Sequence, residues 1–216
     1  DNTADWYPTD VTFNDLGHAT YTVNHKGEKI AQVELSIPGM HNVYNSLSAF
    51  ALATCYGVAT EAIVKGIKNF TGTDRRFQFK GQFNGVNVID DYAHHPTEIQ
   101  ATINSARGTK LNKLWIMFQP HTYTRTYNHL DDFAKVLSEA DHVILLDIYA
   151  SREKDTGLVS SEDLRDKIEA LGGVVTYCPT FNDAEKYAVD NCRKGDMLIT
   201  MGAGDVYKIG EKLVSK

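Results

Sequence analysis

Four short segments of the 216-residue chain bring together acids, imidazoles, hydroxyls and guanidinium groups, the side chains that perform most polar chemistry. Each segment directly follows an apolar run that is typical of a strand. The segments are residues 90–97 (DDYAHHPT), 119–126 (QPHTYTRT), 147–153 (DIYASRE) and 201–205 (MGAGD). Because the ligands of an open parallel sheet bind beyond the carboxyl ends of its strands, these four segments together indicate one site rather than four solvated loops.

The adjacent histidines of the first segment allow three interpretations. His94 and His95 could ligate a metal, although neighbouring side chains point in different directions and an i, i+4 pair on a helix is the stronger zinc pattern. The segment could instead simply end in a helix cap at Thr97, with Glu98 in the first turn. A carboxylate beside two imidazoles at a helix start also suits a phosphate, Mg²⁺ or a nucleotide ribose.

The second and fourth segments are also open to two readings each. Arg125 could hold a substrate carboxylate through its forked guanidinium, or it could pair with Asp131 or Asp132. The glycines at 202–204 resemble part of a dinucleotide-binding pattern, but Tyr207 occupies the third glycine position. A tight turn that brings the backbone close to a neighbour is therefore the commoner explanation. The sequence contains no GxxxxGK[ST] phosphate-binding loop.

Two further groups lie earlier in the chain. Asn42 and Asn45 share one face at the start of a predicted helix, where they could read an adenine edge or cap the helix. The pattern alone favours capping. Arg75 and Arg76 are exposed solubility charge by default, and the alternative is a hinge arginine that reaches a phosphate across a domain cleft.

The elements that must position these residues follow from hydrophobic periodicity. Short strands near 11–13, 19–23 and 30–35 precede helices near 40–56 and 60–67. From about residue 80 strands and helices alternate. The predicted strands are 86–89, 113–118, 142–146, 174–177 and 197–200, and the predicted helices are 97–107, 126–139, 161–171, 181–192 and 205–214. The alternation predicts an α/β domain with a mostly parallel sheet covered on both faces, after a boundary between residues 78 and 79.

Composition excludes some classes of protein. Lys and Arg number 22 against 28 Asp and Glu, and the resulting net charge of −6 argues against nucleic-acid binding. No apolar run has the length of a membrane helix, and no signal-peptide pattern opens the chain. Three cysteines without CxxC spacing indicate reduced thiols in a cytoplasmic protein with no zinc site. Because the sequence opens on Asp1 without methionine, we expect a fragment.

Four strings identify a family resemblance. GMHNVYN at 39–45, DRRF at 74–77, DDYAHHPTE at 90–98 and FQPHTYTRT at 118–126 occur in this order in the Mur ligases, which the chain resembles over essentially its whole length. The resemblance implies the C-terminal part of a central ATP-binding domain at 1–78, followed by a Rossmann-like C-terminal domain at 79–216. It also implies that the N-terminal part of the same enzyme, with the UDP-sugar domain, the P-loop and most Mg²⁺ ligands, is missing and that the fragment alone is inactive.

The family's chemistry joins a carboxylate to an amine with ATP and Mg²⁺, through an acyl phosphate. The DDYAHHPTE and FQPHTYTRT strings favour the branch of the family that joins L-alanine to UDP-N-acetylmuramate in peptidoglycan precursor synthesis. The related branch that attaches a whole peptide to the same sugar nucleotide is one alternative. A non-catalytic Rossmann-type module that binds NAD or ATP is another.

The resemblance further implies roles for individual residues. It implies that His41, Asn42, Asn45 and Asp91 contact the adenine and the ribose. It implies that Arg76 contacts the ATP phosphates. The residues implied for catalysis are His94, His95 and Arg76. Those implied for the amino-acid or product carboxylate are His95, His121 and Arg125. Many relatives carry arginine where Thr122 stands, so Arg125 is expected to be the main carboxylate anchor; no metal ligand is assigned within the chain.

Overall fold

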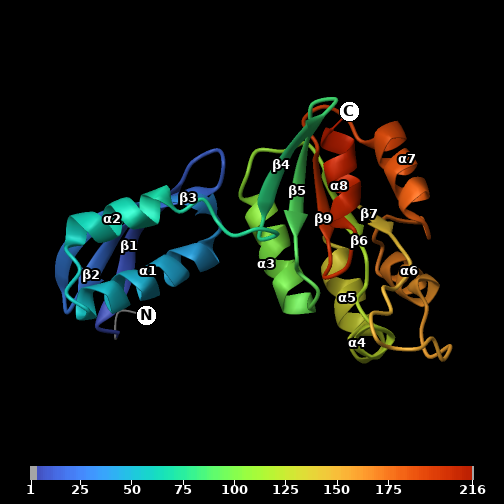
Figure 1. Cartoon of the computed structure of the whole chain (residues 1–216), viewed down its shortest axis with the longest axis horizontal. Helices are drawn as coiled ribbons and strands as arrows, with labels where there is room; N and C mark the ends of the chain where they lie inside the picture. Colours follow the sequence, from blue (N-terminus) through green and yellow to red (C-terminus); the bar gives the residue numbers. More distant parts are fainter. Residues whose placement is uncertain (1–3, 216) are drawn as a thin grey trace. The chain divides into compact units, whose positions relative to one another are not determined.

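The structure, a computed structural model, describes residues 4–215. The chain forms two compact units. The first contains the chain up to Thr73 together with Asn104–Lys110, and the second contains Asp74–Ile103 and Leu111–Lys216. The assignment of residues 1–78 and 79–216 to two domains of a ligase stays a prediction. Figure 1 shows the elements of each unit.

The first unit is an antiparallel sheet packed against two helices. Its strands lie in the order β1 (Trp6–Phe13), β2 (His18–His25) and β3 (Glu28–Pro38), and its helices are α1 (Met40–Cys55) and α2 (Thr60–Asn69). Alternate residues of β2 and β3 point inward, so that Tyr21, Val23 and Val33 are fully buried with Phe50 of α1. The three strands and two helices predicted for this part of the chain are confirmed.

The second unit is built on a six-stranded sheet with the order β4-β5-β9-β6-β7-β8. β4 pairs antiparallel with β5, and every other pair is parallel, so the predicted fold class is confirmed. The strands are β4 (Gln78–Phe83), β5 (Val86–Asp91), β6 (Leu114–Phe118), β7 (His142–Leu145), β8 (Val175–Tyr177) and β9 (Met197–Met201). All residues of β6 and β9 are buried, as expected of central strands covered on both faces.

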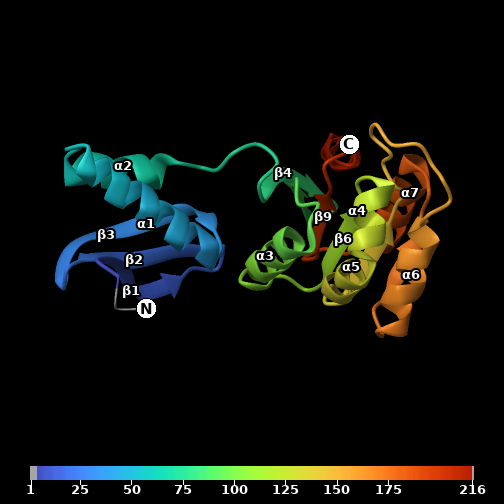
Figure 2. The ribbon, with the colours of Figure 1, turned by 90° about the horizontal axis from the view of Figure 1, so that it is seen from below.

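Helices cover both faces of this sheet. Figure 2 shows α3 (Pro96–Arg107), α5 (Leu130–Leu137) and α6 (Ser161–Ala170) along one face, with α7 (Phe181–Asn191) and the C-terminal helix α8 (Tyr207–Val214) on the other. Val88, Met117 and Leu198 belong to the buried cluster that includes residues of α7 and α8, whereas Phe118 packs against Phe133 of α5. The sheet therefore lies between two apolar layers, and the loops that follow its strands start from this packed base.

One predicted helix is wrong in its extent. The single helix expected over 126–139 is two helices, α4 (Tyr123–Asn128) and α5. His129 separates them with a non-helical φ of −119° and ψ of 22°. The first helix starts earlier than expected because the Thr122 hydroxyl accepts the backbone N–H of Arg125, as an N-cap does.

The remaining composition-based expectations concern cysteines and membranes. All three cysteines are free thiols: Cys55 is exposed, and Cys178 and Cys192 are buried. Burial raises the pKa of Cys192 to about 12. Across residues 4–215 no helix combines the length and the apolar character needed to span a bilayer.

Candidate functional site

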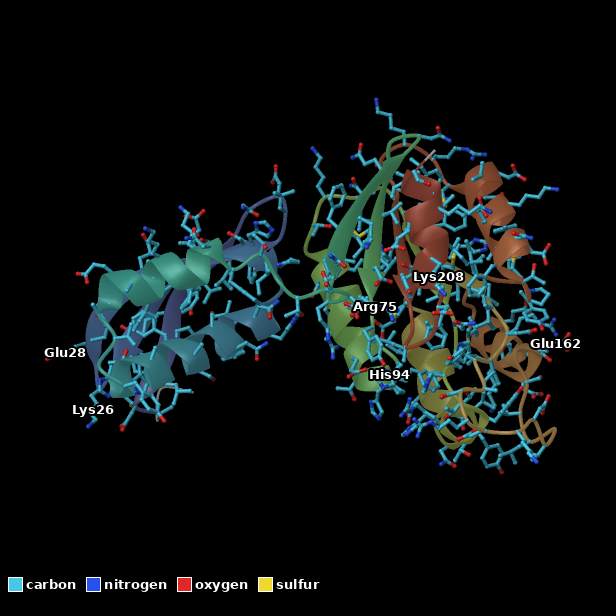
Figure 3. All side chains as sticks on the ribbon, viewed as in Figure 1. Lys26, Glu28, Arg75, His94, Glu162 and Lys208 are labelled. Atoms are coloured by element: carbon cyan, nitrogen blue, oxygen red, sulfur yellow. The ribbon has the colours of Figure 1, made fainter. Side chains whose placement is uncertain are left out.

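The four polar segments meet at one edge of the six-stranded sheet, where β5, β6, β7 and β9 end. Figure 3 labels Arg75 and His94 in this region. The ladder hydrogen bonds continue past the strand ends, because the N–H of Gln119 donates to Met201 O (3.0 Å) and that of Gly202 donates to Asp91 O (3.1 Å). Three of the segments are thereby fixed in register with one another by backbone alone.

The glycine-rich turn after β9 packs tightly on the segment after β6. A Cβ atom on Gly202, whose φ is +141°, would lie 2.6 Å from the carbonyl oxygen of Gln119. A Cβ on Gly204 would lie 2.5 Å from Oε1 of Gln119 and 3.0 Å from the Tyr149 ring. The tight-turn explanation of these glycines is confirmed, since only a residue without a side chain permits this approach.

Arg75 is a fixed part of the site wall. Its Nε donates to Oδ2 of Asp90 (2.9 Å) and its Nη2 to the carbonyl of Gly202 (2.7 Å). The guanidinium carbon lies 4.9 Å from the ring centre of Tyr92 and 4.6 Å from that of Tyr207. Asp90 is only 1% exposed, so Arg75 neutralises a buried charge and is not the exposed solubility charge expected by default.

Asp91 ties two loops to the end of β5. Its Oδ2 accepts the backbone N–H of Phe77 (2.9 Å) and its Oδ1 that of Ala93 (2.8 Å). Burial raises the pKa of the Asp91 carboxyl, while the two amides and the charge of Arg76 act in the opposite direction. Arg76 itself is exposed, with its guanidinium carbon 5.9 Å from the ring centre of Tyr92.

The partners of His94 indicate its tautomer. Nδ1 lies 3.0 Å from the carbonyl oxygen of Tyr92, which can only accept, so Nδ1 carries the proton. The same nitrogen is 3.4 Å from Oε2 of Glu98. In the neutral ring Nε2 is then a proton acceptor. The ring lies edge-on to that of His121, with 5.9 Å between the centres.

His95 points elsewhere and starts α3. Its Nδ1 accepts the backbone N–H of Thr97 (3.3 Å), and Pro96 occupies the first helical position. The expected cap at Thr97 is therefore wrong, because the helix begins before this residue. The His95 ring lies 4.8 Å from that of His129. The expectation that the adjacent histidines point in different directions is confirmed.

His121 and Arg125 form a pair. Nη1 of Arg125 lies 3.0 Å from Nδ1 of His121, and since a guanidinium only donates, Nδ1 is the acceptor and Nε2 carries the proton. The His121 ring stacks on Tyr149 with 5.7 Å between the centres. Burial lowers the pKa of His121, and the charges of Arg125 and His94 lower it further.

The alternative partners considered for Arg125 are engaged in other pairs. Asp131 bonds Nζ of Lys167 (2.5 Å), and Asp132 lies 3.6 Å from Nδ1 of His129. The prediction of a local ion pair for Arg125 is therefore wrong, because the guanidinium reaches back one helical turn to His121 instead.

The three residues predicted to contact adenine lie in the first unit, on α1. Nδ2 of Asn42 donates to Pro38 O (2.7 Å), and Nδ2 of Asn45 donates to Oδ1 of Asn42 (3.2 Å). The helix has Gly39 at its N-cap with no side-chain cap hydrogen bond, so the capping expectation is wrong. His41 and Asn45 are exposed. A nucleotide role for these residues stays a prediction.

Four residues of the site were not predicted as functional. Tyr92 and Tyr149 provide the aromatic walls, His129 lies against His95, and Glu153 accepts the N–H of Thr124 (2.9 Å). The strand-end rule contains a signal for Tyr92, Tyr149 and Glu153, which all follow predicted strands. For His129 the sequence contains none. Within residues 4–215 no three His, Cys, Asp or Glu side chains are arranged to hold a metal.

Known proteins are similar to this chain in sequence and in fold. Residues 75–204 match the family model described as Mur ligase, glutamate ligase domain. A UDP-N-acetylmuramate–L-alanine ligase of Lachnospira eligens is 52% identical over 206 residues, which are 95% of this chain and 45% of that protein. The crystal structure of a UDP-N-acetylmuramate–alanine ligase from Thermotoga maritima superposes with a TM-score of 0.82 at 25% identity, over 98% of this chain and 45% of the other.

A further solved structure belongs to a murein peptide ligase from Psychrobacter arcticus. It is 27% identical with a TM-score of 0.68, over 99% of this chain and 44% of the other. The chain thus spans about half the length of the relatives that it matches. Its overlap with the alanine ligase is the better of the two structural superpositions.

Proposed function

The chain belongs to the Mur ligase family, and we propose that it forms part of an ATP-dependent ligase that joins L-alanine to UDP-N-acetylmuramate in peptidoglycan precursor synthesis. One observation carries the proposal. An imidazole acceptor on His94 and a donor pair on His121 and Arg125 meet at one sheet edge, in a chain 52% identical to a ligase of that name. An amide-forming site needs these two functions, one for the amine and one for the carboxylate of the amino acid.

The carboxylate of L-alanine would be held by His121 and Arg125. Nε2–H of His121 and the free N–H groups of the guanidinium are donors, and a carboxylate is an acceptor with matching geometry. Because Arg125 occupies Nδ1 of His121, the imidazole is neutral and contributes a directed hydrogen bond. Thr122 is the N-cap of α4, where its hydroxyl accepts the N–H of Arg125.

The amine of L-alanine must lose a proton before it can attack. Nε2 of His94 is a proton acceptor in the neutral ring, and its partner Tyr92 O holds the ring in that tautomer. We assign His94 as the general base. The His95 ring lies against that of His129, and we propose it for the carboxylate side of the site.

The chain's own residues fit ATP at two places. The exposed guanidinium of Arg76 suits a phosphate, and we propose the Asp91 carboxylate for a ribose hydroxyl, although it already accepts two backbone amides and the Thr102 hydroxyl. When bound, ATP supplies the phosphoryl group that activates the muramate carboxylate. We propose His41, Asn42 and Asn45 for the adenine. Mg²⁺ would depend on ligands outside this chain.

A chimaeric enzyme tests the proposal. The matching 206-residue region of the Lachnospira eligens ligase is replaced by this chain, and ADP release is measured. We expect release only with both UDP-N-acetylmuramate and L-alanine, and a rate at least about tenfold lower for Arg76→Met. The control is Lys186→Met, an exposed cation on α7. The 216-residue chain alone is expected to release no ADP.

Other outcomes would replace the proposal. Turnover with a peptide in place of L-alanine would assign the chain to the peptide-attaching branch. If the chimaera is inactive with both and the chain binds NAD tightly in a calorimetric titration, the chain is a nucleotide-binding module. Since ATP is the expected co-substrate, we place the enzyme in the cytoplasm.

A further inference from the structure

Backbone hydrogen bonds join the segment after β7 to the segment after β6. The N–H of Tyr149 donates to Pro120 O (2.8 Å), and the N–H of Thr122 donates to Tyr149 O (2.9 Å). These bonds form an isolated parallel bridge between His121 and Tyr149, whose rings also stack. The position of His121 is therefore set by a neighbouring loop as well as by its own strand.

Glu153 joins the segment after β7 to α4 as well. Its Oε2 accepts the backbone N–H of Thr124 at 2.9 Å. The carboxylate reaches the helix because a tight turn, closed by the Glu153 N–H on Ala150 O (3.0 Å), folds the chain back. Ser151 within that turn has a φ of +55°, a region that a side chain disfavours. A backbone held in this conformation by its surroundings is a common feature of functional loops.

The Glu153 carboxylate lies at the N-terminal end of α4, where the helix dipole favours a negative charge. α4 has no acidic residue in its first turn, and its N-terminal N–H groups carry the positive end of the helix dipole. The residue before it, Thr122, has a φ of +65°. The pKa of Glu153 is lowered, chiefly because its carboxylate accepts the Thr124 amide, so the group is ionised at neutral pH. A negative charge thus lies at the start of a six-residue helix, next to a residue with a positive φ.

The same charge acts on His121. Glu153 raises the pKa of this imidazole, against burial and the charges of Arg125 and His94, which lower it. Glu153 therefore acts on both members of the pair. It bonds the backbone of the helix that carries Arg125, and its charge raises the pKa of His121.

We propose that Glu153 is a positioning residue of this site, which holds the first turn of α4 so that Arg125 stands beside His121. The role rests on the proposed function only for the identity of the ligand, the carboxylate of an amino acid. The hydrogen bond by which Glu153 holds α4 lies within this chain and does not depend on the ligand.

Nuclear magnetic resonance on the 216-residue chain tests whether Glu153 holds the first turn of α4. In Glu153→Ala we expect exchange of the Thr124 amide hydrogen to be about fivefold faster or more, and the His121 pKa to fall. Glu153→Gln keeps an acceptor oxygen and loses the charge, so the amide should stay protected while the His121 pKa still falls. The control Glu169→Gln removes an exposed carboxylate from α6 and should change neither. Unchanged amide protection in the alanine variant, or an unchanged His121 pKa in both variants, would overturn the proposal.

The chimaeric ligase tests the consequence for substrate. Glu153→Ala should raise the KM for L-alanine about fivefold or more with a smaller change in kcat, and Glu153→Gln should restore most of it. A change in kcat alone would contradict a positioning role. If the parent chimaera shows no dependence on L-alanine, the proposed function fails, whereas the resonance experiment still decides the role of Glu153 in the chain.

Discussion

Nη1 of Arg125 lies 3.0 Å from Nδ1 of His121, one helical turn before it in the chain. The hydrogen bond exists only when Nδ1 has no proton, so it couples the arginine's position to a neutral imidazole. His94, 5.9 Å away between ring centres, has the opposite tautomer because a carbonyl oxygen faces its Nδ1. Two neighbouring histidines thus offer one donor and one acceptor, which is the pairing an amino acid requires.

The first prediction concerns the charge of His121. In Arg125→Gln we expect the pKa of His121 to rise, because the guanidinium that opposes protonation is gone. Burial remains, so the value should stay below that of an exposed histidine. The measurement is a pH titration of the His121 ring carbon by nuclear magnetic resonance, with Lys186→Gln as the matched loss of a distant positive charge. A pKa that falls in Arg125→Gln would contradict the effect assigned to the guanidinium charge.

The second prediction separates two adjacent arginines. Arg75→Met leaves Asp90, which is 1% exposed, without its counter-ion, so we expect the free energy of unfolding to fall by about 3–5 kcal/mol. Arg76→Met removes an exposed group and should cost less than about 0.5 kcal/mol. Urea denaturation of both variants measures this. In the chimaeric ligase only Arg76→Met should lose activity at a temperature where both variants are folded. Equal losses of stability would refute the assignment of Arg75 to the wall.

The third prediction concerns the turn after β9. In Gly202→Ala the new Cβ would lie 2.6 Å from a backbone oxygen of Gln119, and backbone cannot move aside as a side-chain tip does. We expect a loss of roughly 1–3 kcal/mol of unfolding free energy, measured in urea. Gly157→Ala is the control, since its φ is also positive (+71°) but nothing lies within 4 Å of the added Cβ. A similar loss in both variants would mean that the close approach has no energetic weight.

The fourth prediction is a pH dependence of stability. The pKa of His142 is lowered by burial and by the charge of Lys113, while the ring stacks on Trp115. The unfolded chain therefore binds a proton more readily than the folded chain, and stability that is present above about pH 6.5 is lost as the pH falls below it. Urea denaturation at pH 7.5 and 5.5 should show this loss, and His142→Gln should reduce it. Between pH 8.5 and 7.5 the variant and the wild type should change alike.

Most of the second unit's sheet could be predicted because its strands are continuous apolar runs. β4 could not, since QFKGQF has few apolar residues and forms a half-exposed edge strand. The break at His129 also left no trace in the sequence, because no glycine or proline marks it. The early start of α4 at the Thr122 cap was not visible either, because a hydrogen bond from Thr122 to the loop after β7 supports it through space.

The site was predictable to the level of strand ends and no further. The rule that ligands bind at the carboxyl edge identified His94, His121 and Arg125 as candidates. The rule could not predict which of two adjacent residues in the chain points into the site. Arg75 has a φ of +59°, and its side chain forms an ion pair with the buried Asp90. Two consecutive arginines in a sequence indicate neither of these facts.

β9 is the last strand along the chain and yet stands third in the sheet, between β5 and β6. β6 ends at Phe118, and β9 begins only at Met197. During synthesis, β5 and β6 must therefore wait with unpaired, apolar edges until residues 197–201 leave the ribosome, a state that invites association with other chains. The segments that carry His94 and His121 are aligned only when β9 pairs between β5 and β6, so a nascent chain stopped before Met197 lacks the Met201 and Gly202 hydrogen bonds that join them.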